Sequence, residues 1–298
     1  MRRLLLIDAS SYIHRAFHAA PKMVNNEGFP IGAIQTFTWM MLKVMKPRTF
    51  PNFHDHVAVV FEKSAKTFRH KLHAGYKAGR VRHEDLTKQM PTCREIVSTL
   101  GITRVEVDGF EADDVIASFC AKCPFDTRIT VATPDKDLMQ VMRPGFIEVY
   151  DPRGGKDNEG AMRTPEEIER VFGAGIKPRQ IVDVQALCGD PVDKIPGVAG
   201  IGEKTASALV AKFGSLEVVL AAPDGEFPSP RIARLVKAGA DSARLSYSLA
   251  RLSTNVPIPT LEMTKRQDVD AEALVKLLVQ LRLQSIARQV ARDYRVAL

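Results

Sequence analysis

Short apolar runs recur along the first half of the chain and alternate with segments whose apolar residues follow helical spacing. The runs consist mainly of Leu, Ile, Val and Ala, as in strands that are buried on both faces of a sheet. They predict strands at about residues 3–8, 57–62, 103–108, 128–133 and 145–150. Helices are predicted at about 12–20 and 33–46, and a helix follows each of the strands at 103–108 and 128–133. This alternation predicts an α/β fold with a mostly parallel sheet and helices on both of its faces.

After about residue 164 the pattern changes to helices alone. Thr164 is a suitable N-cap, Pro165 fits the first helical position, and Lys177-Pro178 marks the start of another helix. No further strand pattern follows. The sequence therefore predicts a domain boundary near residue 164.

Length and composition favour an ordinary globular protein. The chain of 298 residues is long enough for one large domain or two small ones, and 45% of its residues are hydrophobic. No apolar run approaches the roughly 18 residues of a membrane span, and the run after Met1-Arg2-Arg3 is too short for a signal peptide. The four cysteines are too few for a disulfide scaffold, so we interpret them as reduced thiols. These features predict a soluble cytoplasmic protein.

Acidic residues gather where the predicted strands end. They come from four separate stretches of the chain: Asp8; Glu62; Glu111, Asp113 and Asp114; and Asp135 and Asp137. Because the carboxyl ends of parallel strands lie along one edge of a sheet, these acids are expected to converge on one pocket. For any one pair the commoner role of such acids is to cap a helix. Their repetition at several strand ends favours the pocket.

Positive charge is concentrated in residues 63–94. The whole chain has a net charge of +7 and a pI near 9.2, which suggests a polyanionic partner. Residues 63–94 alone reach +7, from nine basic residues against Glu84 and Asp85. The basic residues are Lys63, Lys66, Arg69, Lys71, Lys77, Arg80, Arg82, Lys88 and Arg94. Phe68 and Tyr76 lie among them, and such a mixture can hold single-stranded nucleic acid, although a basic run can also be a solvated surface.

A glycine-rich turn follows a further pair of acids, Asp190 and Asp193. It contains Gly197, Gly200 and Gly202, with Lys204 at the start of the next helix. Backbone N–H groups at such a turn can approach a phosphate, although a turn of this kind can also be only a tight connection between helices. Beside an acidic pocket and a basic segment, a clamp on the backbone of duplex DNA is the better interpretation.

Six stretches resemble, in the same order, motifs of the bacterial 5′-3′ exonuclease and flap endonuclease family. They are LIDASSYIHRAFH from residue 6, TFRH from 67, YKAGR from 76, EADD from 111, DKDLMQ from 135 and GDPVDKIPG from 189. The family includes the N-terminal domain of DNA polymerase I and free-standing bacterial and phage nucleases, and the resemblance covers about residues 4–220. It implies a PIN-like nuclease core in residues 1–163 with a helical arch at about 63–94. A helix-three-turn-helix DNA-binding region at 164–260 and a C-terminal helical segment at 261–298 would follow.

The resemblance also implies a function. The protein would be a metal-dependent, structure-specific 5′ nuclease of replication or repair that acts on branched duplex DNA with a 5′ flap or 5′ end. It would leave a 5′-phosphate and a 3′-hydroxyl, and act as a monomer without a membrane partner. Two Mg²⁺ or Mn²⁺ ions would be held by Asp8, Glu62, Glu111, Asp113, Asp114, Asp135, Asp137, Asp190 and Asp193. A potassium ion can occur at the helix-three-turn-helix region.

Residues that would handle the DNA follow from the same resemblance. Tyr76, Lys77 and Arg80 match arch residues that engage the scissile phosphate and the flap. DNA contacts are expected from Lys66, Arg69, Gly197, Gly200, Gly202 and Lys204.

Three positions depart from the family pattern. Glu62 replaces an aspartate, Pro134 replaces a glycine, and Lys194 replaces an asparagine. Two alternatives therefore remain: a non-catalytic protein that binds branched DNA, and a PIN-type ribonuclease. The length fits both a free-standing nuclease and a fragment of a polymerase.

Overall fold

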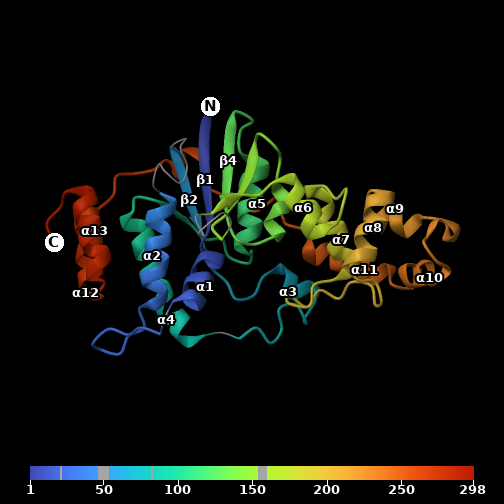
Figure 1. Ribbon diagram of the computed structural model, residues 1–298, viewed down its shortest axis with the longest axis horizontal. Coiled ribbons are helices and arrows are strands. Elements are labelled where there is room, and N and C mark those ends of the chain that lie inside the picture. Colours follow the sequence, from blue (N-terminus) through green and yellow to red (C-terminus); the bar gives the residue numbers. More distant parts are fainter. Residues whose placement is uncertain (21, 46–53, 82, 154–159) are drawn as a thin grey trace.

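A computed structural model describes residues 1–20, 22–45, 54–81, 83–153 and 160–298 (Figure 1). Its strands are β1 (Arg2–Asp8), β2 (His56–Val60), β3 (Thr103–Val105), β4 (Thr127–Ala132), β5 (Ile147–Asp151) and β6 (Ala161–Met162). They form one sheet in the order β3-β2-β1-β4-β5-β6, in which only β6 is antiparallel to its neighbour. The predicted α/β fold with a mostly parallel sheet is confirmed.

The central strand β1 explains why a continuous apolar run predicted a strand. Leu5 and Ile7 point to one face of the sheet and Leu4 and Leu6 to the other, and all four are at most 1% exposed. Alternate side chains of a strand lie on opposite faces, so a strand covered on both sides must be apolar throughout.

Helices cover both faces of the sheet. One face packs against α1 (Ala9–Ala19), α2 (Gly32–Val44), α4 (Glu84–Thr99), α12 (Ala271–Gln280) and α13 (Gln284–Tyr294). The other packs against α5 (Ala112–Lys122) and the short 3₁₀ helix η1 (Asp137–Val141), which stands where a regular helix was expected after β4. Residue 46, the predicted end of the second helix, lies outside the described residues. The C-terminal helices α12 and α13 lie beside α2, so the two ends of the chain share this sheet lobe (Figure 1).

A second, helical lobe has its own apolar core. It contains α6 (Pro165–Phe172), η3 (Pro178–Gln180), α7 (Ile181–Cys188), α8 (Glu203–Phe213), α9 (Leu216–Ala221), η4 (Asp224–Glu226), α10 (Pro230–Ala238) and α11 (Ala240–Ala250). The predicted helix start is confirmed, since the Thr164 side chain accepts a hydrogen bond from the Glu167 N–H and Pro165 is the first helical residue. None of the helices in the described part of the chain has the length and apolarity that a membrane crossing requires.

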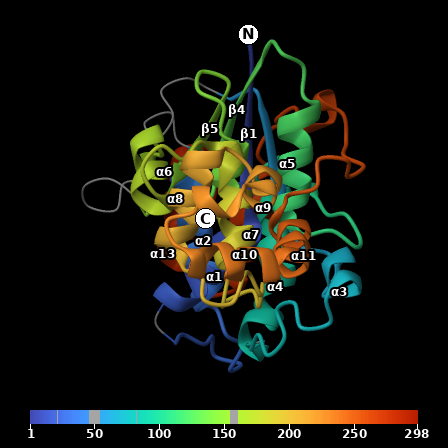
Figure 2. The same ribbon diagram turned by 90° about the vertical axis from the view of Figure 1, so that its right-hand side faces the viewer.

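Two segments join the lobes besides the direct connection from β6 to α6 at residues 163–164. After α11 the chain runs back along α5 to η5 (Leu261–Thr264), which contacts β2. Residues 63–94, the bridge segment, contain α3 (Phe68–Leu72) and the start of α4. In both views α3 lies beside α11, whereas α4 packs on α2, so the bridge segment passes from the helical lobe to the sheet lobe (Figures 1 and 2).

Candidate metal centre

A cleft of about 570 Å³ lies between the carboxyl edge of the sheet, the bridge segment and the helical lobe. Eight of the nine acids predicted to hold metal line it: Asp8, Glu62, Glu111, Asp113, Asp135, Asp137, Asp190 and Asp193. Six come from the sheet lobe, and Asp190 and Asp193 follow α7 of the helical lobe. The expected convergence of separate acidic stretches is therefore present in the fold.

Backbone and hydroxyl donors hold the acids that follow β1 and β4. Asp8 accepts the Ser11 N–H at 3.1 Å, which caps α1, and its other oxygen accepts the Thr133 hydroxyl at 2.8 Å. The Thr133 hydroxyl oxygen in turn accepts the Asp135 N–H at 3.0 Å, and an Asp135 oxygen accepts the Asp137 N–H at 2.9 Å. Asp8 thus combines the capping role with a place in the cleft. Asp135 keeps its place although Pro134 precedes it.

The acids from the helical lobe sit in a tight turn at the end of α7. An Asp190 oxygen accepts the N–H groups of Val192 and Asp193, and the Asp190 and Ile195 backbones bond to each other in both directions. Gly189 has a φ of 74°, and a Cβ there would lie 2.5 Å from the Ile195 carbonyl oxygen. Only glycine fits this close crossing.

Lys77 connects the two groups of acids. Its ammonium lies 3.1 Å from Glu111 Oε2 and 3.6 Å from Asp193 Oδ2. The backbone N–H of Lys77 also donates to the backbone carbonyl of Asp193 at 2.9 Å. Its φ of 50° is unusual for a residue with a side chain, and such strain tends to occur at functional sites. Tyr76, next to it, donates its hydroxyl to Glu111 Oε2 at 3.1 Å.

Burial, and after it the charge of neighbouring acids, raises the pKa of five carboxylates of the cleft. Burial, together with neighbouring Asp135 and Asp8, raises the pKa of Asp113 well above its ordinary value. Burial and then Asp135 raise the pKa of Asp137 to about 7. Burial also raises the pKa values of Glu62, Asp135 and Asp193, against the lowering effect of Lys77. Burial acts to lower the pKa of Lys77, but the charges of Glu111 and Asp193 raise it further, so Lys77 stays charged at neutral pH.

The donor set fits divalent cations such as Mg²⁺ or Mn²⁺. All eight acids offer hard oxygen ligands. Burial and then neighbouring carboxylates raise the pKa values of Asp113 and Asp137, and a bound cation would relieve this repulsion. Within the described ranges, no three Asp, Glu, His or Cys side chains already form a coordination group. Side chains of the cleft would therefore have to rotate around an ion.

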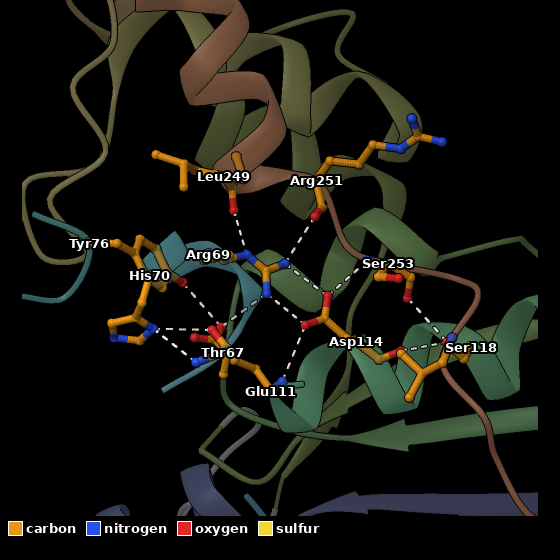
Figure 3. Close-up of polar contacts among 12 residues, drawn as sticks. Thr67, Arg69, His70, Tyr76, Glu111, Asp114, Ser118, Leu249, Arg251 and Ser253 are labelled. Carbon is orange, nitrogen blue, oxygen red and sulfur yellow. Dashed lines mark hydrogen bonds and ion pairs between the residues drawn. The ribbon is translucent and has the colours of Figure 1, made fainter. Parts of the chain in front are cut away.

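The predicted roles of Asp114 and Arg69 need correction. Asp114 is fully buried and does not line the cleft, because both of its oxygens bond to the Arg69 guanidinium, at 2.6 and 2.8 Å. Arg69 lies at the wall of the cleft but is only 2% exposed, and its guanidinium faces this carboxylate rather than DNA (Figure 3). The concentration of basic residues at 63–94 gave no sign that this cation is buried whereas its neighbours are exposed.

The proposed base-stacking surface and the glycine turn are also only partly as predicted. The Tyr76 ring is 3% exposed and packs edge-on against His70, so it offers no stacking surface. Gly197 is buried and its N–H donates to the Ser246 hydroxyl, so it cannot bind a phosphate. Exposed residues that remain candidates for DNA contact are Lys66, Arg80, Gly200, Gly202 and Lys204. Arg82 lies outside the described residues.

Two departures from the family pattern acquire a physical meaning. Lys194 has a φ of 58°, a left-handed conformation that asparagine tolerates better than lysine. Glu62 lines the cleft, so its longer side chain does not displace it from the acids.

Sequence reasoning missed Gln185, His14 and Lys136, which also line the cleft. The Gln185 amide donates to Asp137 Oδ1 at 2.7 Å from a position only 4% exposed. A polar residue within the apolar run of α7 was the signal that could have revealed it.

Family comparisons agree with this architecture. The model of the 5′-3′ exonuclease N-terminal resolvase-like domain matches residues 3–173, and that of the 5′-3′ exonuclease C-terminal SAM fold matches residues 176–272. The chain is 33% identical over 303 residues to a 5′-3′ exonuclease of Aquifex aeolicus, covering all of this chain and 98% of that protein. It is 37% identical over 289 residues to the thermostable DNA polymerase I of Thermus aquaticus, covering 96% of this chain. The chain spans about a third of the length of that polymerase and of the other thermostable polymerases it matches.

Solved structures with the same fold include the T5 5′-exonuclease with bound divalent zinc ions. The TM-score is 0.65 at 16% identity, and the match covers 98% of each chain. The T5 flap endonuclease in complex with DNA and metal ions matches with a TM-score of 0.64 at 15% identity, over 98% of this chain and 97% of that one.

Proposed function

This chain belongs to the 5′-3′ exonuclease family, and on that premise we propose that it is a metal-dependent, structure-specific 5′ nuclease of replication or repair. It hydrolyses phosphodiesters of branched duplex DNA with a 5′ flap or 5′ end, and leaves a 5′-phosphate and a 3′-hydroxyl. The observation that carries the proposal is the meeting of eight acids from both lobes in one cleft, with Lys77 between them.

The proposed metal site uses the eight acids of the cleft and excludes Asp114. Two divalent ions, Mg²⁺ or Mn²⁺, would supply a more acidic bound water and charge stabilisation for the scissile phosphate when bound. The chain's own contribution is to hold the carboxylates: Thr133 fixes Asp8 and Asp135, and Gln185 fixes Asp137.

In this proposal two residues of the bridge segment act on the substrate, and a third, Tyr76, positions an acid of the cleft. Lys77 and Arg80 line the cleft, where their positive charges can offset the charge that develops on the scissile phosphate. The Tyr76 hydroxyl holds one oxygen of Glu111 in place. Lys77 stays protonated because Glu111 and Asp193 raise its pKa.

Contacts to the DNA backbone are proposed at the start of α8. Gly202 is the N-cap of this helix, and Gly200, Gly202 and Lys204 are exposed. An exposed helix N-terminus with a nearby lysine suits a phosphate. Lys66 adds an exposed charge on the bridge segment. We further propose a potassium ion near this turn, a monomeric state and a cytoplasmic location.

The direct test is cleavage of a labelled 5′-flap DNA and of its RNA equivalent by the purified protein, with Mg²⁺ and with a chelator. Cleavage of the DNA flap that requires Mg²⁺ is the expected result. Cleavage of neither substrate would favour a non-catalytic protein that binds branched DNA. Strong preference for the RNA would favour a PIN-type ribonuclease.

A further inference from the structure

Arg69 is a buried arginine at the junction of three segments. Its Nε donates to the Leu249 carbonyl at 2.7 Å and its Nη2 to the Arg251 carbonyl at 3.0 Å. The same guanidinium makes two bonds to Asp114, and its Nη1 lies 3.4 Å from Glu111 Oε2. Figure 3 shows this planar group between the end of α11 and the start of α5.

Asp114 is satisfied to the same degree. Besides the two bonds from Arg69, one oxygen accepts the Ser253 N–H at 2.8 Å and the other accepts the Glu111 N–H at 3.2 Å. A carboxylate with four donors and no exposure has no lone pair left for a ligand in the cleft. Asp114 therefore serves the protein's own structure.

Ser118 extends the junction by one turn of α5. Its hydroxyl donates to the Asp114 carbonyl at 2.8 Å and accepts the Val256 N–H at 3.0 Å. The segment 249–256, which leaves the helical lobe after α11, is thus fastened to α5 at several points. The first turn of α5 and the residue before it carry the cleft acids Asp113 and Glu111.

Glu111 is the link between this junction and the cleft. Arg69, Tyr76 and Lys77 all approach the same oxygen, Oε2. The three donors hold the Glu111 carboxylate by this oxygen, at the wall of the cleft.

We propose that Arg69 and Asp114 are positioning residues. By fastening the segment 249–253 to the start of α5, they hold Glu111 and Asp113 in place for metal binding. This inference rests on the proposed metal site of the cleft. Lysine cannot replace Arg69 in this role, because its single ammonium cannot serve two carbonyl groups and both oxygens of a carboxylate in one plane. Loss of a partner that orients a metal ligand commonly weakens metal binding by about 10- to 100-fold.

The test is the affinity of the full chain for Mn²⁺, measured by titration calorimetry, for Arg69→Lys and Asp114→Asn. We expect both variants to bind Mn²⁺ at least about tenfold more weakly. The Mg²⁺ concentration for half-maximal flap cleavage should rise by a similar factor, while the rate at saturating Mg²⁺ stays within about threefold and flap binding in chelator is unchanged.

Arg163→Lys is the matched control, because Arg163 forms a largely buried ion pair with Asp151 and is not among the residues that line the cleft. It should keep the Mn²⁺ affinity of the parent. Equal losses of Mn²⁺ affinity in Arg69→Lys and Arg163→Lys would overturn the proposal. A loss of Mn²⁺ affinity in Asp114→Asn but not in Arg69→Lys would also overturn it, because Asp114 would then itself be a metal ligand. If Arg69→Lys does not fold in thermal unfolding, Ser118→Ala decides, with a loss of about threefold expected and parental affinity contradicting the proposal.

These outcomes are separable from the proposed function. If Arg69→Lys weakens Mn²⁺ binding but the parent cleaves no flap, the nuclease function is refuted and the positioning role stands. If the parent cleaves the flap but Arg69→Lys leaves the Mn²⁺ affinity unchanged, the nuclease function stands and the positioning role is refuted.

Discussion

Asp137→Asn should stabilise the metal-free protein. Asp137 lies in the cleft after β4, where burial and then the charge of Asp135 raise its pKa from an ordinary 3.8 to about 7. Asparagine keeps the oxygen that accepts the Gln185 amide. Its own amide group can donate to the neighbouring carboxylates, which the ionised aspartate repels.

The size of the effect follows from linkage. Below pH 3.8 Asp137 is protonated in both the folded and unfolded states, so its burial makes no pH-dependent contribution there. Between pH 3.8 and about 7 the unfolded state loses this proton first, which lowers the folding stability by about 1.4 kcal/mol per pH unit. The upper bound is about 4 kcal/mol, and because Asp135 shares this repulsion we expect about 2–4 kcal/mol.

Urea unfolding in chelator, at pH 4 and pH 7.5, measures this difference. At pH 7.5 the free energy of unfolding of Asp137→Asn should exceed that of the parent, and at pH 4 the two should nearly agree. Mg²⁺ should stabilise the parent more than the variant and so narrow the gap. A variant that is no more stable than the parent at pH 7.5 would show that the cleft acids do not repel one another as described.

Three further predictions concern single positions. Lys194→Asn should raise the free energy of unfolding by about 0.5–1 kcal/mol in urea, because the left-handed φ of 58° suits asparagine; a loss would contradict this. Burial lowers the pKa of His54 to about 4, so the unfolded state takes up a proton first as the pH drops from 6.5 to 4, and the free energy of unfolding should fall by about 2–3 kcal/mol. An equal fall in His54→Gln would show that His54 is not the cause. Glu62→Asp should keep flap cleavage within about tenfold and Glu62→Gln should lose more, whereas a Gln variant equal to the parent at every Mg²⁺ concentration would make Glu62 a bystander.

The strands and the acids at their ends could be predicted because their signals are local. β1 and β2 contain the unbroken apolar runs 4–7 and 57–60, and β4 is mostly apolar after Arg128, since both faces of the sheet are covered there. The acids at or just after these runs mark where each strand ends. The helix start at Thr164 was predictable for the same reason, since the cap and its partner lie three residues apart.

The buried role of Arg69 could not be predicted in this way. Its partners lie 45 residues away at Asp114 and 180 residues away at Leu249, and neither spacing leaves a periodic signal. The same holds for Gly197, whose N–H is used by Ser246, 49 residues further along the chain. The composition of a basic run or a glycine-rich turn predicts only the typical environment of its residues. Whether one residue is exposed or buried against a partner depends on tertiary contacts.

The most direct test of the account is single-turnover cleavage of a 5′-flap DNA by Asp135→Ala/Asp137→Ala, with flap binding measured in parallel. The matched control is Glu272→Ala/Asp293→Ala, which removes two exposed acids from the C-terminal helices α12 and α13. We predict that the cleft variant loses cleavage at every Mg²⁺ concentration but keeps its affinity for the flap, because exposed cations carry the backbone contacts, and that the control matches the parent. Cleavage by the cleft variant at the parental rate would contradict the assignment of the cleft as the metal-dependent active site.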